Sequence, residues 1–136
     1  MRAPRAAALA KGPLGAATDP APVIQVGNLV VVVGTPVDEH LSPDPEAVPR
    51  AVSELLDQLR PGQHVVLRST VYPGVTRRVE RLLARTGLAL DLSFCPERIA
   101  EGQAMTELFA LPQIVASRTP EATQRAAALF GKLTDS

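Results

Sequence analysis

Glu97 and Glu101 are the residues of this chain whose type and spacing most readily suggest proton chemistry. They lie four residues apart in the segment SFCPERIAEG, with Arg98 between them. If the residues after the Cys-Pro step are helical, the two carboxylates share one face, one turn apart. A solvated surface face is the usual explanation for such charges. Their position directly after an alternating apolar run favours a crevice, where a carboxylate can move a proton or order a water molecule.

Two other polar motifs also follow apolar runs, namely Gly34-Thr35-Pro36 and Ser69-Thr70. The carboxyl ends of parallel strands meet at one edge of a sheet, so these motifs and residues 95–97 should line one ligand-binding crevice. The first motif is equally consistent with a simple turn. The second could merely cap the following helix, or its hydroxyl and N–H groups could bind a ribose or a carboxamide.

Strands and helices alternate along the chain in a way that would position these motifs. Apolar or β-branched runs predict strands over residues 28–34, 64–69, 88–94 and 113–117, and the first run, closed by Gly34, is typical of a strand buried on both faces. Helical spacing predicts helices over residues 45–60, 75–87 and 119–133, with a less periodic helical stretch reaching about Ala110. In the last helix Thr119 is the expected N-cap and Pro120 the first helical residue. The pattern predicts an α/β fold, a partial Rossmann-like parallel sheet with helices on both faces.

Composition indicates a soluble, cytoplasmic globular chain. With 14 basic and 14 acidic side chains, nothing points to nucleic acid or an anionic membrane, and the longest apolar run is only strand-sized. At 136 residues we expect one domain, with a poorly defined segment over 1–22 and the folded domain over 23–136.

The cysteine and histidines predict no further chemistry. Cys95 is the sole cysteine, so it forms no internal disulfide, and we interpret it as a small buried thiol instead of a nucleophile. His40 and His64 have no ligand-spaced partners, so we expect surface or loop positions and no metal site.

Three ordered blocks, VVVVGTPVDE, VVLRSTVYPGVT and SFCPERIAEGQAMTEL followed by LPQIVA, resemble the UDP-glucose/GDP-mannose dehydrogenase family. The CPERIAEG form is most similar to its UDP-N-acetyl-D-mannosamine dehydrogenase branch, and the resemblance runs from about Gly12 to Ser136. It implies an NAD-dependent enzyme that oxidises the C6 alcohol of a UDP-sugar to the uronate in two steps, through a thiohemiacetal and a thioester on a catalytic cysteine.

The resemblance also implies roles for individual residues. The residues implied at the cofactor are Val33, Gly34, Thr35, Pro36, Val37, Ser69, Thr70, Val71 and Glu101. Those implied along the sugar nucleotide are Glu97, Arg98, Ile99, Ala100 and Glu101. Glu97 would donate or accept the proton, through a water molecule that Thr70 helps to hold.

The chain also departs from the family pattern. It has no GxGxxG phosphate loop, and Cys95 lies in the CPE block, whereas the family nucleophile lies in a separate glycine-rich segment. We therefore expect an internal fragment of the NAD-binding domain that lacks its first βαβ unit and produces no NADH alone, from an intact enzyme that could be a homo-oligomer. The alternative is a non-catalytic module that associates with a full-length dehydrogenase through an exposed sheet edge.

Overall fold

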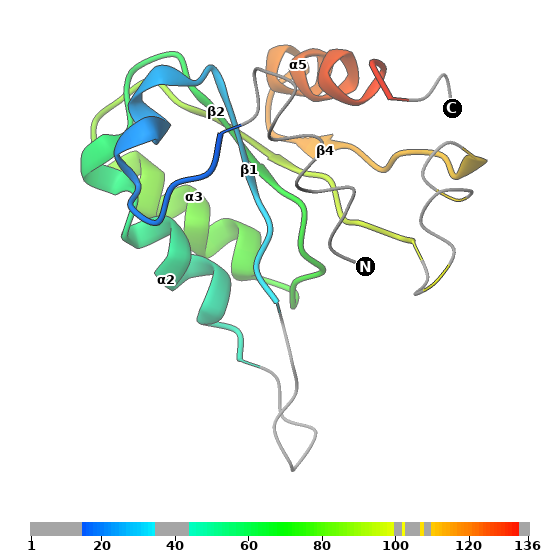
Figure 1. Cartoon of the computed structure of the whole chain (residues 1–136), viewed down its shortest axis with the longest axis horizontal. Helices are drawn as coiled ribbons and strands as arrows, with labels where there is room; N and C mark the ends of the chain where they lie inside the picture. The colour runs from blue at the N-terminus through cyan, green and yellow to red at the C-terminus, as the bar shows by residue number, and fades with distance from the viewer. Residues whose placement is uncertain (1–14, 35–43, 100–101, 103–106, 108–109, 134–136) are drawn as a thin grey trace.

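The computed structural model of the chain describes residues 15–34, 44–99, 102, 107 and 110–133. Its centre is a sheet whose strands follow chain order, β1 (Asn28–Val31), β2 (His64–Leu67), β3 (Asp91–Phe94) and β4 (Ala116–Ser117). β1, β2 and β3 are parallel (Figure 1). The register aligns Val30 with Val66 and Val66 with Ser93. The predicted α/β class with parallel strands is confirmed.

Helices cover both faces of this sheet, as expected (Figure 1). α2 (Ala47–Ser53) and α3 (Val75–Arg85) pack on one face, and α5 (Pro120–Phe130) packs on the other. Two 3-10 helices, η1 (Ala21–Gln25) and η2 (Leu56–Gln58), precede β1 and β2. Val65 and Leu67 join the core cluster that contains α2 and α3 residues, whereas Val66 packs with Ala126 and Phe130 of α5. Because successive strand side chains point to opposite faces, β2 is buried on both sides.

The helices have local causes in the sequence. The helix predicted over 45–60 divides into α2 and η2, and at the end of α2 the Ser53 hydroxyl donates to the carbonyl of Arg50. Such a bond competes with regular helical bonding. The predicted N-cap of α5 is confirmed, because Thr119 Oγ1 accepts from the N–H of Ala122 at 3.2 Å. The helical stretch expected before Ala110 falls largely outside the described residues.

β4 differs from the sequence prediction, because it runs antiparallel to β3 and is much shorter than residues 113–117. An apolar run indicates burial but carries no information on strand direction. The antiparallel direction places Ser117 opposite Ser93, with their hydroxyl oxygens 2.6 Å apart, and allows Arg118 to pair with Glu80 of α3. One antiparallel edge strand on a parallel sheet is a common arrangement.

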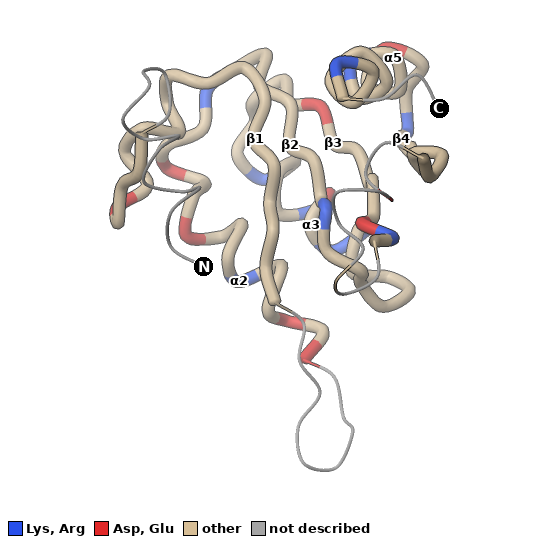
Figure 2. Tube along the Cα trace, turned by 45° about the vertical axis from the view of Figure 1, so that its right-hand side comes forward, with Lys and Arg blue, Asp and Glu red and all other residues tan. Residues whose placement is uncertain are grey.

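Charged residues of both signs are interspersed along the described trace (Figure 2). This distribution accords with the formal net charge of zero. Within the described ranges, no helix is long and apolar enough to cross a membrane.

Candidate functional site

The ends of β1 and β2 are joined by the side chain of Ser69. Its hydroxyl donates to the carbonyl oxygen of Val33 and accepts from the N–H of the same residue, both at 2.7 Å. Ser69 is buried, and α3 has Gly74 as its N-cap, with no side-chain cap. The interpretation of Ser69 and Thr70 as a helix cap is therefore wrong. Gly74 has a φ of 94°, in the left-handed region that glycine adopts without strain.

Thr70 and Gly34 are exposed at this edge, whereas Val71 is half-buried and packs against the core. No described residue hydrogen-bonds to the Thr70 hydroxyl, so this group is available to a ligand or to water. Three further candidate residues of the first block, Thr35, Pro36 and Val37, lie outside the described residues.

The end of β3 lies beside the end of β2, because hydrogen bonding continues beyond the strands. The N–H of Cys95 donates to Leu67 O at 2.9 Å, and the N–H of Glu97 donates to Arg68 O at 2.9 Å. On the other side, the N–H of Arg68 donates to Val31 O at 2.9 Å. The three polar motifs therefore begin at one edge of the sheet, as the sequence predicts.

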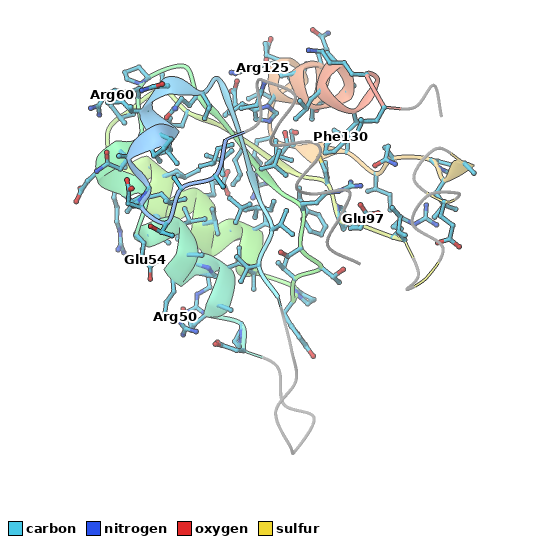
Figure 3. All side chains as sticks on the ribbon, viewed as in Figure 1. Arg50, Glu54, Arg60, Glu97, Arg125 and Phe130 are labelled. Carbon is cyan, nitrogen blue, oxygen red and sulfur yellow. The ribbon has the colours of Figure 1, made fainter. Side chains whose placement is uncertain are left out.

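Arg68 is a functional candidate that the sequence reasoning missed. Its side chain is 8% exposed and forms an ion pair with Glu97. It also donates to Cys95 O at 3.1 Å and to Gln113 Oε1 at 3.0 Å, and its guanidinium lies 4.7 Å from the centre of the Phe130 ring. Figure 3 labels Glu97 and Phe130, two of these partners. An arginine inside the strand-like run HVVLRS was the available signal, since buried charges require partners.

Glu97 is held as a carboxylate. Burial favours its neutral form, but this effect is outweighed by hydrogen bonds from the N–H groups of Arg98 and Ile99, at 2.8 and 3.1 Å, and by the Arg68 guanidinium. The pKa of Glu97 therefore lies below its ordinary value. At neutral pH the group accepts hydrogen bonds or a proton and is not a donor.

The segment after Pro96 is not helical over residues 96–99, so the assumption behind the one-turn spacing of Glu97 and Glu101 is wrong for those residues. The two backbone N–H groups that follow Glu97 turn back to its own carboxylate instead of continuing a helix. Arg98 is exposed and Ile99 half-buried, whereas Ala100 and Glu101 lie outside the described residues.

His64 lies in the core, so the expectation of a surface or loop position is wrong. It is fully buried in β2, with Nε2 2.7 Å from Ser93 Oγ and Nδ1 3.3 Å from Asn28 Oδ1. Burial, aided by the charge of Arg125 and opposed by that of Asp91, lowers its pKa. Among the described residues, no group of three or more His, Cys, Asp or Glu side chains could hold a metal ion.

Cys95 is fully buried and free, which agrees with the interpretation as a small buried thiol. Burial raises its pKa to about 11, although the charge of Arg68 opposes the shift. The thiol is therefore protonated at neutral pH.

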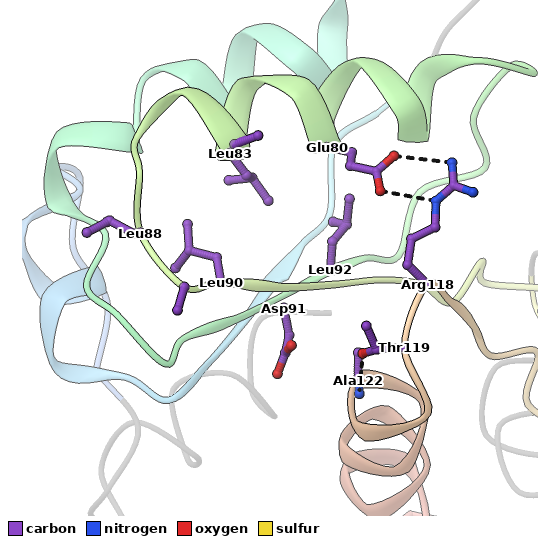
Figure 4. Close-up of a pocket in the computed structure, with 11 residues that line it drawn as sticks. Glu80, Leu83, Leu88, Leu90, Asp91, Leu92, Arg118, Thr119 and Ala122 are labelled. Atoms are coloured by element: carbon purple, nitrogen blue, oxygen red, sulfur yellow. Dashed lines mark hydrogen bonds and ion pairs between the residues drawn. The ribbon is translucent and has the colours of Figure 1, made fainter.

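A separate pocket of about 340 Å³ lies along β3, between α3 and the start of α5 (Figure 4). Its walls are mainly apolar, and the Glu80–Arg118 ion pair lies at one end. None of the candidate residues lines it. The candidate residues that the structure describes therefore lie at the carboxyl edge of the sheet and not in this pocket.

Comparison with known proteins gives a consistent assignment. Residues 4–134 match the model of the UDP-glucose/GDP-mannose dehydrogenase family, NAD binding domain. The chain is 31% identical over 113 residues to UDP-N-acetyl-D-mannosamine dehydrogenase of Yersinia pestis, an alignment that covers 74% of this chain and 27% of the relative. It is 31% identical over 110 residues to UDP-N-acetyl-D-glucosamine 6-dehydrogenase of Pseudomonas aeruginosa, with coverage of 76% and 26%.

The fold agrees with this assignment. The crystal structure of NDP-N-acetyl-D-galactosaminuronic acid dehydrogenase from Methanosarcina mazei Go1 superposes with a TM-score of 0.78 and 26% identity. That superposition covers 85% of this chain and 26% of the solved chain. The chain thus spans between a quarter and a third of the length of the curated relatives it matches.

Proposed function

Because this chain belongs to the UDP-glucose/GDP-mannose dehydrogenase family and matches its NAD-binding domain, we propose that it forms part of an NAD-dependent UDP-sugar 6-dehydrogenase. The proposed reaction is oxidation of the C6 alcohol of a UDP-sugar to the uronate, and UDP-N-acetyl-D-mannosamine is the proposed substrate. Relatives named for that activity support this choice, as does the CPERIAEG block. In such chemistry NAD accepts the hydride.

The observation that carries the proposal is the convergence of three strand ends at one edge of the sheet. Ser69 is hydrogen-bonded to Val33 there, and Arg68 forms an ion pair with Glu97 at the same edge. Open α/β sheets bind ligands outside the carboxyl ends of their strands. The donor set suits a dinucleotide, because the exposed Gly34 backbone and Thr70 hydroxyl can meet polar ribose or carboxamide groups.

Glu97 is the proposed proton acceptor. Its lowered pKa keeps it ionised at neutral pH, and its side chain is 37% exposed, so a water molecule or a substrate hydroxyl can reach it. Thr70 would help to hold that water. Arg98 and Ile99 would contact the sugar nucleotide, and Thr35, Pro36, Val37, Ala100 and Glu101 remain candidates by family resemblance.

Backbone amide NMR with added NAD tests the cofactor site. We expect chemical-shift changes at the carboxyl edge, over Val33, Gly34, Ser69, Thr70 and Val71, and a weaker response in Thr70→Val. Thr123→Val on α5 is the matched control, because it also removes one threonine hydroxyl, far from this edge in sequence and on another element. Shifts confined to the pocket of Figure 4, or equal loss in both variants, would contradict the site.

We also propose that the 136-residue chain alone does not catalyse the oxidation. A near-attack geometry needs cofactor, substrate and nucleophile held together, and the only cysteine is buried and protonated. We expect no NADH fluorescence when purified chain, NAD and UDP-N-acetyl-D-mannosamine are mixed. Sustained NADH production that Glu97→Gln abolishes would overturn this expectation and would assign the activity to the chain itself.

A second candidate function is favoured by the exposure of β1, which lies at one edge of the sheet formed by the described strands. Val30 is 42% exposed and Val32 is 73% exposed, beside backbone that pairs only with β2 among the described strands. Such an edge can add a strand from another chain. The chain would then act as a module that binds a full-length dehydrogenase of the family. Native mass spectrometry of the mixture tests this, and Val32→Lys should abolish a genuine edge-to-edge complex.

A further inference from the structure

Arg68 is a charged side chain enclosed by residues from three other parts of the molecule. It follows β2 directly, and its partners are Glu97 and Cys95 at the end of β3, Gln113 before β4, and Phe130 of α5. With 8% of its side chain exposed, the guanidinium has little access to water, so these partners must compensate its desolvation. Cys95 contributes its carbonyl oxygen and not a charge, because its thiol is protonated.

The two carboxylate oxygens of Glu97 have different partners. Oε1 accepts from the N–H groups of Arg98 and Ile99, which belong to its own segment. Oε2 is bound by Arg68 Nη2, which comes from the neighbouring strand. Local backbone therefore holds one oxygen, and among the described residues the guanidinium alone connects the carboxylate to the rest of the sheet. Guanidinium geometry suits this task, since its planar fork can serve Glu97, Cys95 and Gln113 together, which an ammonium group cannot reproduce.

We propose that Arg68 is a positioning residue for Glu97, holding its carboxylate in one orientation at the carboxyl edge of the sheet. The inference rests on the proposed function for the role of Glu97 as proton acceptor, while the positioning itself concerns only this chain. Arg68 acts through Glu97 and has no assigned contact with cofactor or substrate. It keeps the carboxylate ionised and fixed in one orientation, so that little reorganisation is needed when a water molecule or a substrate hydroxyl donates a hydrogen bond to it.

The test is a carbon-detected NMR titration of the Glu97 side-chain carboxyl in the ligand-free chain. Wild type is compared with Arg68→Met, Arg68→Lys and Arg118→Met. Arg118→Met is the matched control, because Arg118 also pairs with a glutamate, Glu80, through two hydrogen bonds at 3.1 and 3.2 Å. We expect the Glu97 titration midpoint to move upward in Arg68→Met, to move less in Arg68→Lys, and to stay unchanged in Arg118→Met.

A purely structural role for Arg68 predicts a different pattern. Arg68→Met would then lower stability while the Glu97 midpoint in the folded protein stayed at its wild-type position, and that result would overturn the proposal. If Arg68→Met does not fold, Arg68→Lys tests the proposal, because it keeps the positive charge and loses the planar guanidinium group. A wild-type midpoint in folded Arg68→Lys, together with unchanged Glu97 carboxyl and amide shifts, would also overturn it.

Because the titration needs no ligand, its outcome is separable from that of the NAD experiment. An upward shift without NAD binding would keep Arg68 as a positioning residue and reject the proposed function. NAD binding without the upward shift would support the proposed function and reject Arg68 as a positioning residue.

Discussion

The hydroxyl of Ser69 makes two hydrogen bonds to the backbone of Val33, donating to its carbonyl oxygen and accepting from its N–H, each at 2.7 Å. Val33 lies two residues beyond the last residue of β1, where regular pairing with β2 has ended. One side chain thus replaces a backbone partner at the point where the ladder stops. Since Ser69 is buried, removing its hydroxyl leaves two backbone groups with reduced access to water.

We predict that Ser69→Ala destabilises the chain by about 1–3 kcal/mol, the cost of leaving buried hydrogen-bonding groups unsatisfied. Chemical denaturation monitored by circular dichroism measures this. Ser53→Ala is the control, because the exposed Ser53 hydroxyl bonds only its own helix, and its loss should change stability by less than about 0.5 kcal/mol. Equal effects of the two changes would show that the Val33 bonds contribute nothing specific.

The buried His64 predicts a loss of stability in mild acid. The lowered pKa means that the unfolded chain binds the proton more readily than the folded one. The contribution of His64 to the free energy of unfolding is therefore complete above pH 6.5, the ordinary pKa of imidazole. It is lost as the pH falls below that value toward the folded-state pKa. The charges that act on the ring, Arg125 disfavouring protonation and Asp91 favouring it, belong to α5 and β3.

Denaturation from about pH 7.5 to about pH 5.5 should reveal a slope of at most about 1.4 kcal/mol per pH unit, the limit for one proton. His64→Gln keeps a group that can hydrogen-bond with Ser93 and should flatten the slope. His40→Asn controls for the other histidine of the chain and should leave the slope in place. If the slope disappears in His40→Asn instead, the acid sensitivity belongs to His40 and the prediction for His64 is contradicted.

Periodicity predicted the elements that local patterns determine. The run at residues 64–69 indicated a strand, and β2 lies there, buried on both faces. The run at residues 28–34 indicated a strand buried on both faces, which is wrong, because β1 lies at an edge of the sheet and Val30 is 42% exposed. Thr119 before Pro120 indicated the start of a helix, and α5 begins there. For β2 and α5 the signal lies within a few residues of the element, because an apolar run and an N-cap are local properties of the chain. Burial on two faces depends instead on what packs against the strand.

The sequence could not reveal partners that lie far apart along the chain. Arg68 meets Glu97 and His64 meets Ser93, each 29 residues away, and neither contact leaves a periodic signal. The direction of β4 was missed for the same reason, because it accompanies contacts of Ser117 and Arg118 with distant residues. The assignments of cofactor and substrate residues remain predictions.

The sheet architecture predicts that two valines in neighbouring strand segments respond very differently to the same change. Val65 is fully buried in β2, whereas Val32 beyond β1 is 73% exposed. Val65→Ala should cost about 2 kcal/mol through lost burial and a residual cavity. Val32→Ala should change stability by less than about 0.5 kcal/mol. A large, concentration-dependent effect of Val32→Ala would mean that another chain covers the β1 edge in solution.

Thiol labelling tests whether Cys95 could act as a nucleophile. The thiolate is the reactive form, and a pKa of about 11 leaves roughly one thiol in a thousand ionised near pH 8, against about a quarter for an unperturbed cysteine. Complete burial suppresses the reaction further, since a reagent must wait for the structure to open. Native protein should therefore react with a disulfide reagent at least about a hundredfold more slowly than the same chain unfolded in guanidinium.

Cys95→Ser should give no signal in either state. Fast labelling of the native chain would require an accessible, ionised thiol beside Arg68, and the interpretation of Cys95 as an inert core residue would then be wrong.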